Sequence, residues 1–113
     1  RTSRCRECTP APGPGLPRPD YAGGGIVNLM ASITRARGGG FDYPSLDLLP
    51  PATIAGHTNL LLLVIDGLGA DWLAARSPGG ILHRHCLGAI TSVFPPTTAT
   101  AITTFLTGDA PHH

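Results

Sequence analysis

Charged residues are scarce in this chain: Asp, Glu, Lys and Arg make up 13% of its 113 residues, and the formal net charge is +1. Such a balance provides no basic patch for a nucleic acid and little attraction to an anionic membrane surface. The longest aliphatic run, from Leu60 to Ile65, is far shorter than the roughly 20 residues of a membrane helix. No apolar stretch typical of a secretory signal follows Arg1. We therefore expect no nucleic-acid partner and no membrane segment, which favours a cytoplasmic location.

Cysteine is also scarce, and three cysteines are too few and odd in number for a disulfide framework. Cys5 and Cys8 form a Cys-x-x-Cys pair, which is half of a possible zinc site. No second pair follows at the spacing of a zinc finger. The pair is therefore interpreted as two thiols in a tail, with a small metal-binding interaction module as the alternative.

Proline and glycine, in contrast, are abundant, and much of the excess lies near the start of the chain. Pro10, Pro12, Pro14, Pro17 and Pro19 exclude a regular helix or a central strand there. The sequence predicts a disordered Pro/Gly-rich tail over residues 1–19 and one structured domain over residues 20–113.

The first structured element is predicted to be a short amphipathic helix. Apolar residues at 26, 29, 30 and 33 follow the spacing of one helical face, and the glycines at 38–40 stop the pattern. Residues 43–57 are rich in proline and leucine, so we expect irregular structure with at most a short turn of helix.

The second half of the chain alternates between apolar runs and helical patterns. Residues 59–65 and 87–94 are predicted to be strands, the first of them buried on both faces of a parallel sheet. Helices are predicted over 70–76 and from Thr98 or Ala99 to Thr107, with Gly108 ending the second one. This order predicts an α/β fold with a parallel sheet flanked by helices.

Asp66 is the first candidate functional residue, because it directly follows the aliphatic run. Ligands bind at the carboxyl ends of strands in open α/β sheets. The glycines at 67 and 69 allow a sharp turn and leave room beside the carboxylate. Asp66 is therefore a candidate metal ligand or general base, or else the cap of the following helix.

The second candidate site is the threonine segment that follows Pro95-Pro96. A helix that starts at this point directs free N–H groups and the positive end of its dipole outward, which suits a phosphate oxygen. A threonine hydroxyl is a weak nucleophile, so it needs a base or a metal beside it. Thr97 or Thr98 is alternatively an ordinary N-cap.

These elements also form an ordered series of motifs. Leu-Leu-Leu-Val-Ile-Asp-Gly-Leu-Gly at 61–69 precedes Thr-Ser-Val-Phe-Pro-Pro-Thr-Thr-Ala-Thr-Ala at 91–101 and Phe-Leu-Thr-Gly at 105–108. The series resembles the type I phosphodiesterase and nucleotide pyrophosphatase family of the alkaline phosphatase superfamily. The likeness covers roughly residues 59–113 and weakens back to about Asp20.

The resemblance implies an alkaline-phosphatase-like fold and metal-dependent hydrolysis of phosphodiester or pyrophosphate bonds in a small-molecule or nucleotide substrate. Two divalent metal ions, usually zinc, are implied as cofactors. Thr98 stands at the position of the family's nucleophile, which also binds a metal ion. Asp66 stands at the position of a second metal ligand. The backbone amides of Thr98 and Ala99 match the groups that bind phosphate oxygens.

The match also departs from the family at two points. Ala101 stands where many members have an asparagine that contacts phosphate, and the further metal ligands of the family lie far beyond the nucleophile. We therefore expect residues 20–113 to correspond to the N-terminal part of such a domain, inactive and prone to aggregate by itself. The alternative is a non-catalytic α/β fragment in which Asp66 and Thr98 cap helices.

Overall fold

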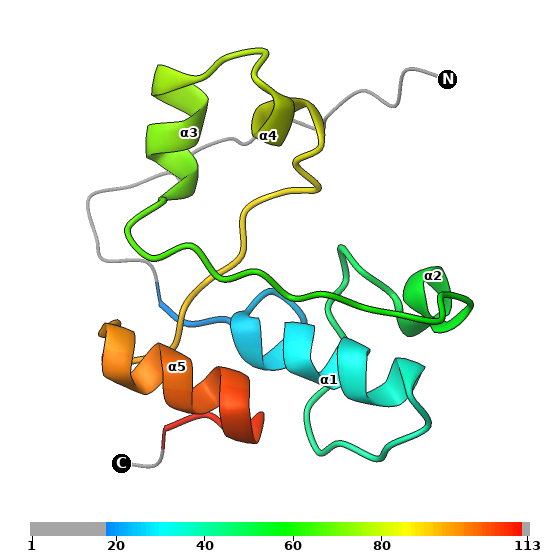
Figure 1. Ribbon diagram of the computed structural model, residues 1–113. Helices are drawn as coiled ribbons and strands as arrows, with labels where there is room; N and C mark the ends of the chain where they lie inside the picture. The colour runs from blue at the N-terminus through cyan, green and yellow to red at the C-terminus, as the bar shows by residue number, and fades with distance from the viewer. Residues whose placement is uncertain (1–17, 112–113) are drawn as a thin grey trace. The chain divides into compact units, whose positions relative to one another are not determined.

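The computed structural model describes residues 18–111. The pair Cys5 and Cys8 and all of the predicted tail except residues 18 and 19 lie outside the described residues. Figure 1 shows the elements, which are α1 (Ile26–Ala36), α2 (Pro51–Ala55), α3 (Ala70–Arg76), α4 (Ile81–Arg84) and α5 (Thr98–Thr107). The chain divides into two units. We call Leu63–Ala89, with α3 and α4, the inserted unit, and we call residues 18–62 with 90–111 the core unit, because the first interrupts the second in sequence.

In the core unit, α1 packs against both α2 and α5. Ile26, Val27, Val93 and Ala110 form its buried hydrophobic cluster, and partly buried side chains such as Phe105 pack against them. Val27 and Val93 are almost completely removed from water. The buried face of α1 carries Ile26, Val27, Asn28, Ala31 and Ser32, whereas Leu29, Met30 and Ile33 of the predicted apolar face are only partly buried.

The helical predictions are largely confirmed. The first predicted helix is α1, which continues to Ala36, and the helices predicted over 70–76 and up to Thr107 are α3 and α5. The short turn of helix expected within 43–57 is α2. The one-turn helix α4 was not predicted, because four residues are too few to show a period. None of the helices between residues 18 and 111 has the length and apolar character needed to cross a membrane.

The predicted α/β fold and its alkaline-phosphatase-like parallel sheet are wrong for the described residues, which contain five helices and no strand. Residues 59–65 and 87–94 are extended or irregular instead. Within residues 18–111, the only trace of a sheet is one isolated parallel bridge between Gly25 and Thr91. In it, the Ile26 N–H donates to the Thr91 carbonyl at 3.0 Å, and the Thr91 N–H donates to the Gly24 carbonyl at 2.8 Å.

The reason for the error lies in the partners that a buried strand needs. A strand in a parallel sheet forms hydrogen bonds with neighbouring strands and is covered by helices on both faces. In the structure, residues 59–65 make no backbone hydrogen bond to another described residue. Their side chains are exposed, with Leu61 at 88% and Leu63 at 74%. Aliphatic composition predicted a buried, paired strand, and this prediction is wrong because the described residues supply no second strand to pair with it.

Gly108 fixes the end of α5, and its replacement is expected to destabilise the core unit. Its φ is 81°, in the left-handed region, and a Cβ placed on it would clash with the Phe41 ring. We expect Gly108→Ala to lower the free energy of unfolding by about 2–3 kcal/mol, the sum of the backbone and steric terms. Urea unfolding followed by circular dichroism measures this loss.

Gly38 provides the matched control, because its φ is also 81° but no atom lies within 4 Å of a Cβ added there. Gly38→Ala should lower the free energy of unfolding by only about 1 kcal/mol, the backbone term alone. Equal losses in the two variants would show that the Phe41 contact adds nothing.

Candidate functional site

Asp66 lies at the end of the exposed aliphatic segment, where the chain turns toward α3. Gly67 directly after it has a φ of 74°, so the turn uses a conformation that favours glycine. The N-cap of α3 is Gly69, and the helix begins at Ala70. Asp66 is therefore not the N-cap of α3, and as an exposed residue it is accessible from solvent.

The second predicted segment, Thr97 to Ala99, starts α5 after the extended approach through Phe94, Pro95 and Pro96. The peptide bond between Phe94 and Pro95 is cis. Thr97 is the N-cap: its hydroxyl oxygen accepts from the Thr100 N–H at 3.4 Å. Thr98 is the first helical residue and is exposed. Thr97 is therefore the cap of α5, and Thr98 is a helical residue that does not cap it.

The backbone amides at this helix start have different partners. The Ala101 N–H donates to the Thr97 carbonyl at 3.0 Å, which closes the first turn, and the Thr100 N–H is taken up by the cap. The Ala99 N–H has no hydrogen-bond partner among residues 18–111. An exposed amide at the positive end of a ten-residue helix is a donor for an anionic oxygen.

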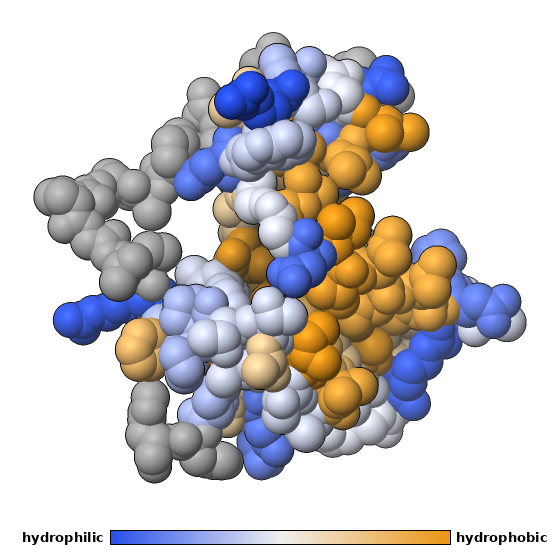
Figure 2. Space-filling model, turned by 60° about the vertical axis from the view of Figure 1, so that its left-hand side comes forward, coloured by the Kyte–Doolittle hydropathy of each residue, from blue (hydrophilic) through white to orange (hydrophobic). Residues whose placement is uncertain are grey.

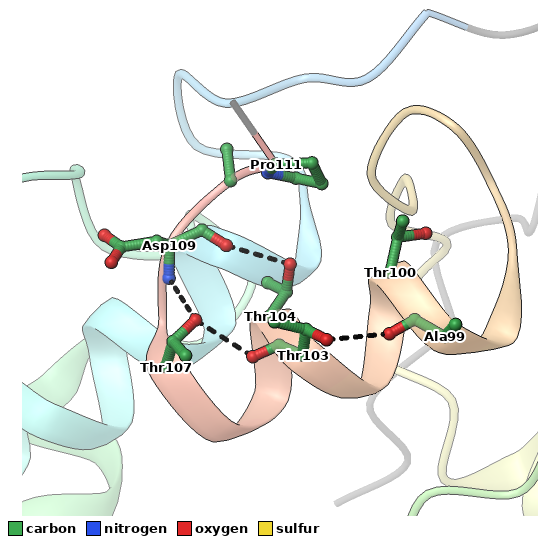
Figure 3. Close-up of a pocket in the computed structure, with 8 residues that line it drawn as sticks. Ala99, Thr100, Thr103, Thr104, Thr107, Asp109 and Pro111 are labelled. Carbon is green, nitrogen blue, oxygen red and sulfur yellow. Dashed lines mark hydrogen bonds between the residues drawn. The ribbon is translucent and has the colours of Figure 1, made fainter. Parts of the chain in front are cut away.

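A pocket of about 400 Å³ lies along α5 and the turn after it. Figure 3 shows the threonines that line it with their hydroxyl groups turned to the backbone. The hydroxyl of Thr103 donates to the Ala99 carbonyl, that of Thr107 to the Thr103 carbonyl, and that of Thr104 to the Asp109 carbonyl, each at 2.9 Å. Because these hydroxyl hydrogens are already used, the pocket offers methyl groups rather than donors, and it suits an apolar group better than a phosphate.

The metal site that the resemblance implies is not present as a cluster in the described part of the chain. Residues 18–111 hold no group of three or more His, Cys, Asp or Glu side chains arranged for a metal ion. Asp66 belongs to the inserted unit and Thr98 to the core unit. Because zinc in proteins is held by at least three protein ligands, these residues alone do not fit a zinc ion.

Thr91 is a positioning residue that the sequence interpretation did not single out. Its hydroxyl accepts from the Asp20 N–H at 2.8 Å, and its backbone forms the bridge to Gly25. Tyr21 adds a second tie, because its hydroxyl accepts from the Phe94 N–H at 3.3 Å. The segment leading to Thr98 is thus attached to residues 20–26. No local pattern shows such a tie, because the bonded residues are about 70 positions apart.

Comparisons with known proteins add no relative: no family model, no curated protein and no solved structure matches this chain.

Proposed function

We propose that this chain supplies a threonine nucleophile, Thr98, and a metal ligand, Asp66, for the hydrolysis of phosphodiester or pyrophosphate bonds. The observation that carries the proposal is the division between neighbouring threonines at the start of α5. Thr97 caps the helix, so Thr98 is not needed as its cap. Thr98 is exposed and lies beside the Ala99 amide, which has no hydrogen-bond partner among residues 18–111. The ordered motifs around both residues, which resemble those of type I phosphodiesterases, supply the reaction class.

In the proposed reaction, the Thr98 hydroxyl oxygen attacks the phosphorus atom of a small-molecule phosphodiester or a nucleotide. The hydroxyl gives up its proton to water, its oxygen bonds to phosphorus, and the bond to the leaving oxygen breaks, so that the leaving oxygen takes a proton from water. A water molecule later attacks the same phosphorus, breaks its bond to Thr98 and restores the threonine hydroxyl. The Ala99 amide and the positive helix end favour the negative charge on the equatorial phosphate oxygens. The carboxylate of Asp66 has the right chemistry for one ligand of a divalent ion.

A threonine hydroxyl needs help to react at neutral pH, and the two divalent metal ions that the resemblance implies, usually zinc, would supply it by favouring the deprotonated oxygen. Because residues 18–111 lack a cluster of three ligands, the complete site needs ligands from elsewhere. The 113-residue chain by itself is therefore expected to bind zinc weakly and to be inactive.

Zinc binding tests the role of Asp66 directly. We expect Asp66→Ala to weaken zinc binding at least tenfold, because even loss of a group behind a ligand weakens metal affinity about 10–100-fold. Isothermal titration calorimetry of the chain with zinc chloride measures the change. Asp71→Ala is the matched control, since Asp71 is an exposed carboxylate in the first turn of α3.

The double variant Cys5→Ser, Cys8→Ser separates this proposal from a metal-binding module at the start of the chain. Under the proposal it retains the zinc binding that depends on Asp66. Zinc binding that survives Asp66→Ala but disappears in the double cysteine variant would refute a ligand role for Asp66.

A further inference from the structure

Packing does little to hold the start of α5 in place. Residues 94–99 are all exposed, and Thr100 is half-buried. Large apolar side chains lie at the surface of this molecule (Figure 2), and Phe94, directly before the two prolines, is 52% exposed. A catalytic side chain is held in place by close packing or by hydrogen bonds from its neighbours. At this helix start the hydrogen bonds must therefore hold Thr98 in position.

The hydroxyl group of Thr100 is the centre of these hydrogen bonds. Its oxygen lies 2.5 Å from the Pro95 carbonyl oxygen and 2.9 Å from the Thr97 carbonyl oxygen, so either carbonyl can accept its hydrogen. It accepts in turn from the Thr97 N–H at 3.3 Å, and the Thr97 hydroxyl oxygen lies 2.9 Å away. One hydroxyl group thus connects the approach to the helix with its first turn.

These contacts enclose Thr98 in a short closed loop of chain. The hydroxyl of Thr100 reaches back five positions to the Pro95 carbonyl, and Thr98 lies within that span. The Thr97 N–H also donates to the Pro95 carbonyl, at 2.9 Å. The Thr97 hydroxyl, in contrast, bonds to Thr100 rather than to the approach segment. Thr98 therefore lies between two tied positions, and the Thr100 side chain supplies the longer of the two ties.

We propose that Thr100 is a positioning residue for the Thr98 hydroxyl in the proposed hydrolysis. Its own hydroxyl is bonded to Pro95 and Thr97, so it acts on the reaction through the placement of Thr98. A displacement of a reacting group by about 1 Å can cost about 10²-fold in rate. The inference rests on the proposed function, because Thr100 has this role only if Thr98 is the nucleophile.

Steady-state hydrolysis of bis-p-nitrophenyl phosphate by the full-length protein with zinc tests the role of Thr100. Thr100→Val removes the hydroxyl but keeps the branched shape and a similar helix propensity. We expect it to lower kcat about 10–100-fold and to change KM by less than about threefold, because a misplaced nucleophile affects the transition state more than substrate binding. Thr100→Ser returns a hydroxyl to the same position and should bring kcat back to within about threefold of the wild type.

Thr97→Ala is the matched control for stability. It removes the other hydroxyl of the capping box but leaves the bond from Thr100 to Pro95. We expect Thr97→Ala and Thr100→Val to lower the urea midpoint of unfolding by similar amounts, since each loses one half of the box. The kcat of Thr100→Val should nevertheless be at least about tenfold lower than that of Thr97→Ala. Equal kcat values in these two variants would overturn the positioning role, and so would a Thr100→Ser variant as slow as Thr100→Val.

Thr98→Ala, measured in the same assay, separates this inference from the proposed function. An inactive Thr98→Ala variant beside a Thr100→Val variant with the kcat of the wild type would overturn the positioning role alone. Activity that survives in Thr98→Ala would overturn both, because Thr100 would then have no nucleophile to position.

Discussion

Thr98→Ala is expected to abolish zinc-dependent hydrolysis of bis-p-nitrophenyl phosphate, with a loss on the order of 10³–10⁶-fold. The substitution removes the oxygen atom that forms the covalent bond to phosphorus, so the reaction loses its two-step path. The helix itself should persist, because the N-cap is Thr97 and alanine is a good helix former at the first helical position. Release of p-nitrophenol by the full-length protein in the presence of zinc measures this loss.

Two variants give this prediction its control. Thr98→Ser keeps a hydroxyl at the same position and should retain a measurable part of the activity. Thr103→Ala removes an exposed threonine of the same helix, whose hydroxyl only donates to the Ala99 carbonyl at 2.9 Å, and it should leave the rate nearly unchanged. Full activity in Thr98→Ala would place the nucleophile elsewhere.

The capping residue provides a further distinction between chemistry and stability. Thr97→Ala should destabilise α5 by about 1 kcal/mol, the usual effect of losing an N-cap side chain. Its rate at saturating substrate and low temperature should therefore exceed that of Thr98→Ala by a large factor. If the two variants lost the same activity, the loss would reflect the helix start rather than one hydroxyl.

Asn28→Asp is expected to produce the largest loss of stability, about 3–5 kcal/mol of unfolding free energy. Asn28 is fully buried in α1, and each polar atom of its side chain is paired. Its amide nitrogen donates to the carbonyls of Tyr21 and Pro44 at 2.8 and 2.9 Å, and its oxygen accepts from the Gly25 N–H at 3.0 Å. A carboxylate would set a buried negative charge against two carbonyl oxygens.

Urea unfolding of the core unit measures this loss, and Ser32→Ala is the matched control. Ser32 is another fully buried polar residue of α1, and its hydroxyl accepts from the Leu46 N–H at 2.8 Å. That N–H also donates to the Asn28 carbonyl at 3.0 Å, so losing the hydroxyl should cost only about 1 kcal/mol. If Asn28→Asp unfolded no more easily than Ser32→Ala, the hydrogen bonds of Asn28 to Tyr21 and Pro44 would not be what stabilises the core unit.

The helices could be predicted from the sequence because their signals are local. The apolar spacing from Ile26 to Ile33 and the proline pair before Thr97 each act within a few residues. The strands could not be predicted in the same way, because a strand exists only with a partner. Leu60–Ile65 has a strand-like composition and strand-like alternation, yet no described segment pairs with it.

For the candidate site, the sequence suggested Asp66 and Thr98 as candidates but did not show which threonine caps the helix. It predicted Thr98 near the start of a helix, which is confirmed. It also predicted Asp66 at the carboxyl end of a buried strand, which is wrong because residues 59–65 form no strand. It did not distinguish Thr97 from Thr98 as the cap, because a shift of one residue in the helix start exchanges their roles. Asn28 and Thr91 were missed since their partners are distant in sequence.

The core unit is built from two stretches of chain that are interrupted by the inserted unit. The bridge between Gly25 and Thr91 and the packing of α1 on α5 join these stretches without any contribution from residues 63–89. For the core unit, the inserted residues act as a loop, and the entropy of closing a loop grows only with the logarithm of its length. Doubling that loop would cost the core unit only about 0.6 kcal/mol, so the stability of the core unit should depend little on the length of residues 63–89.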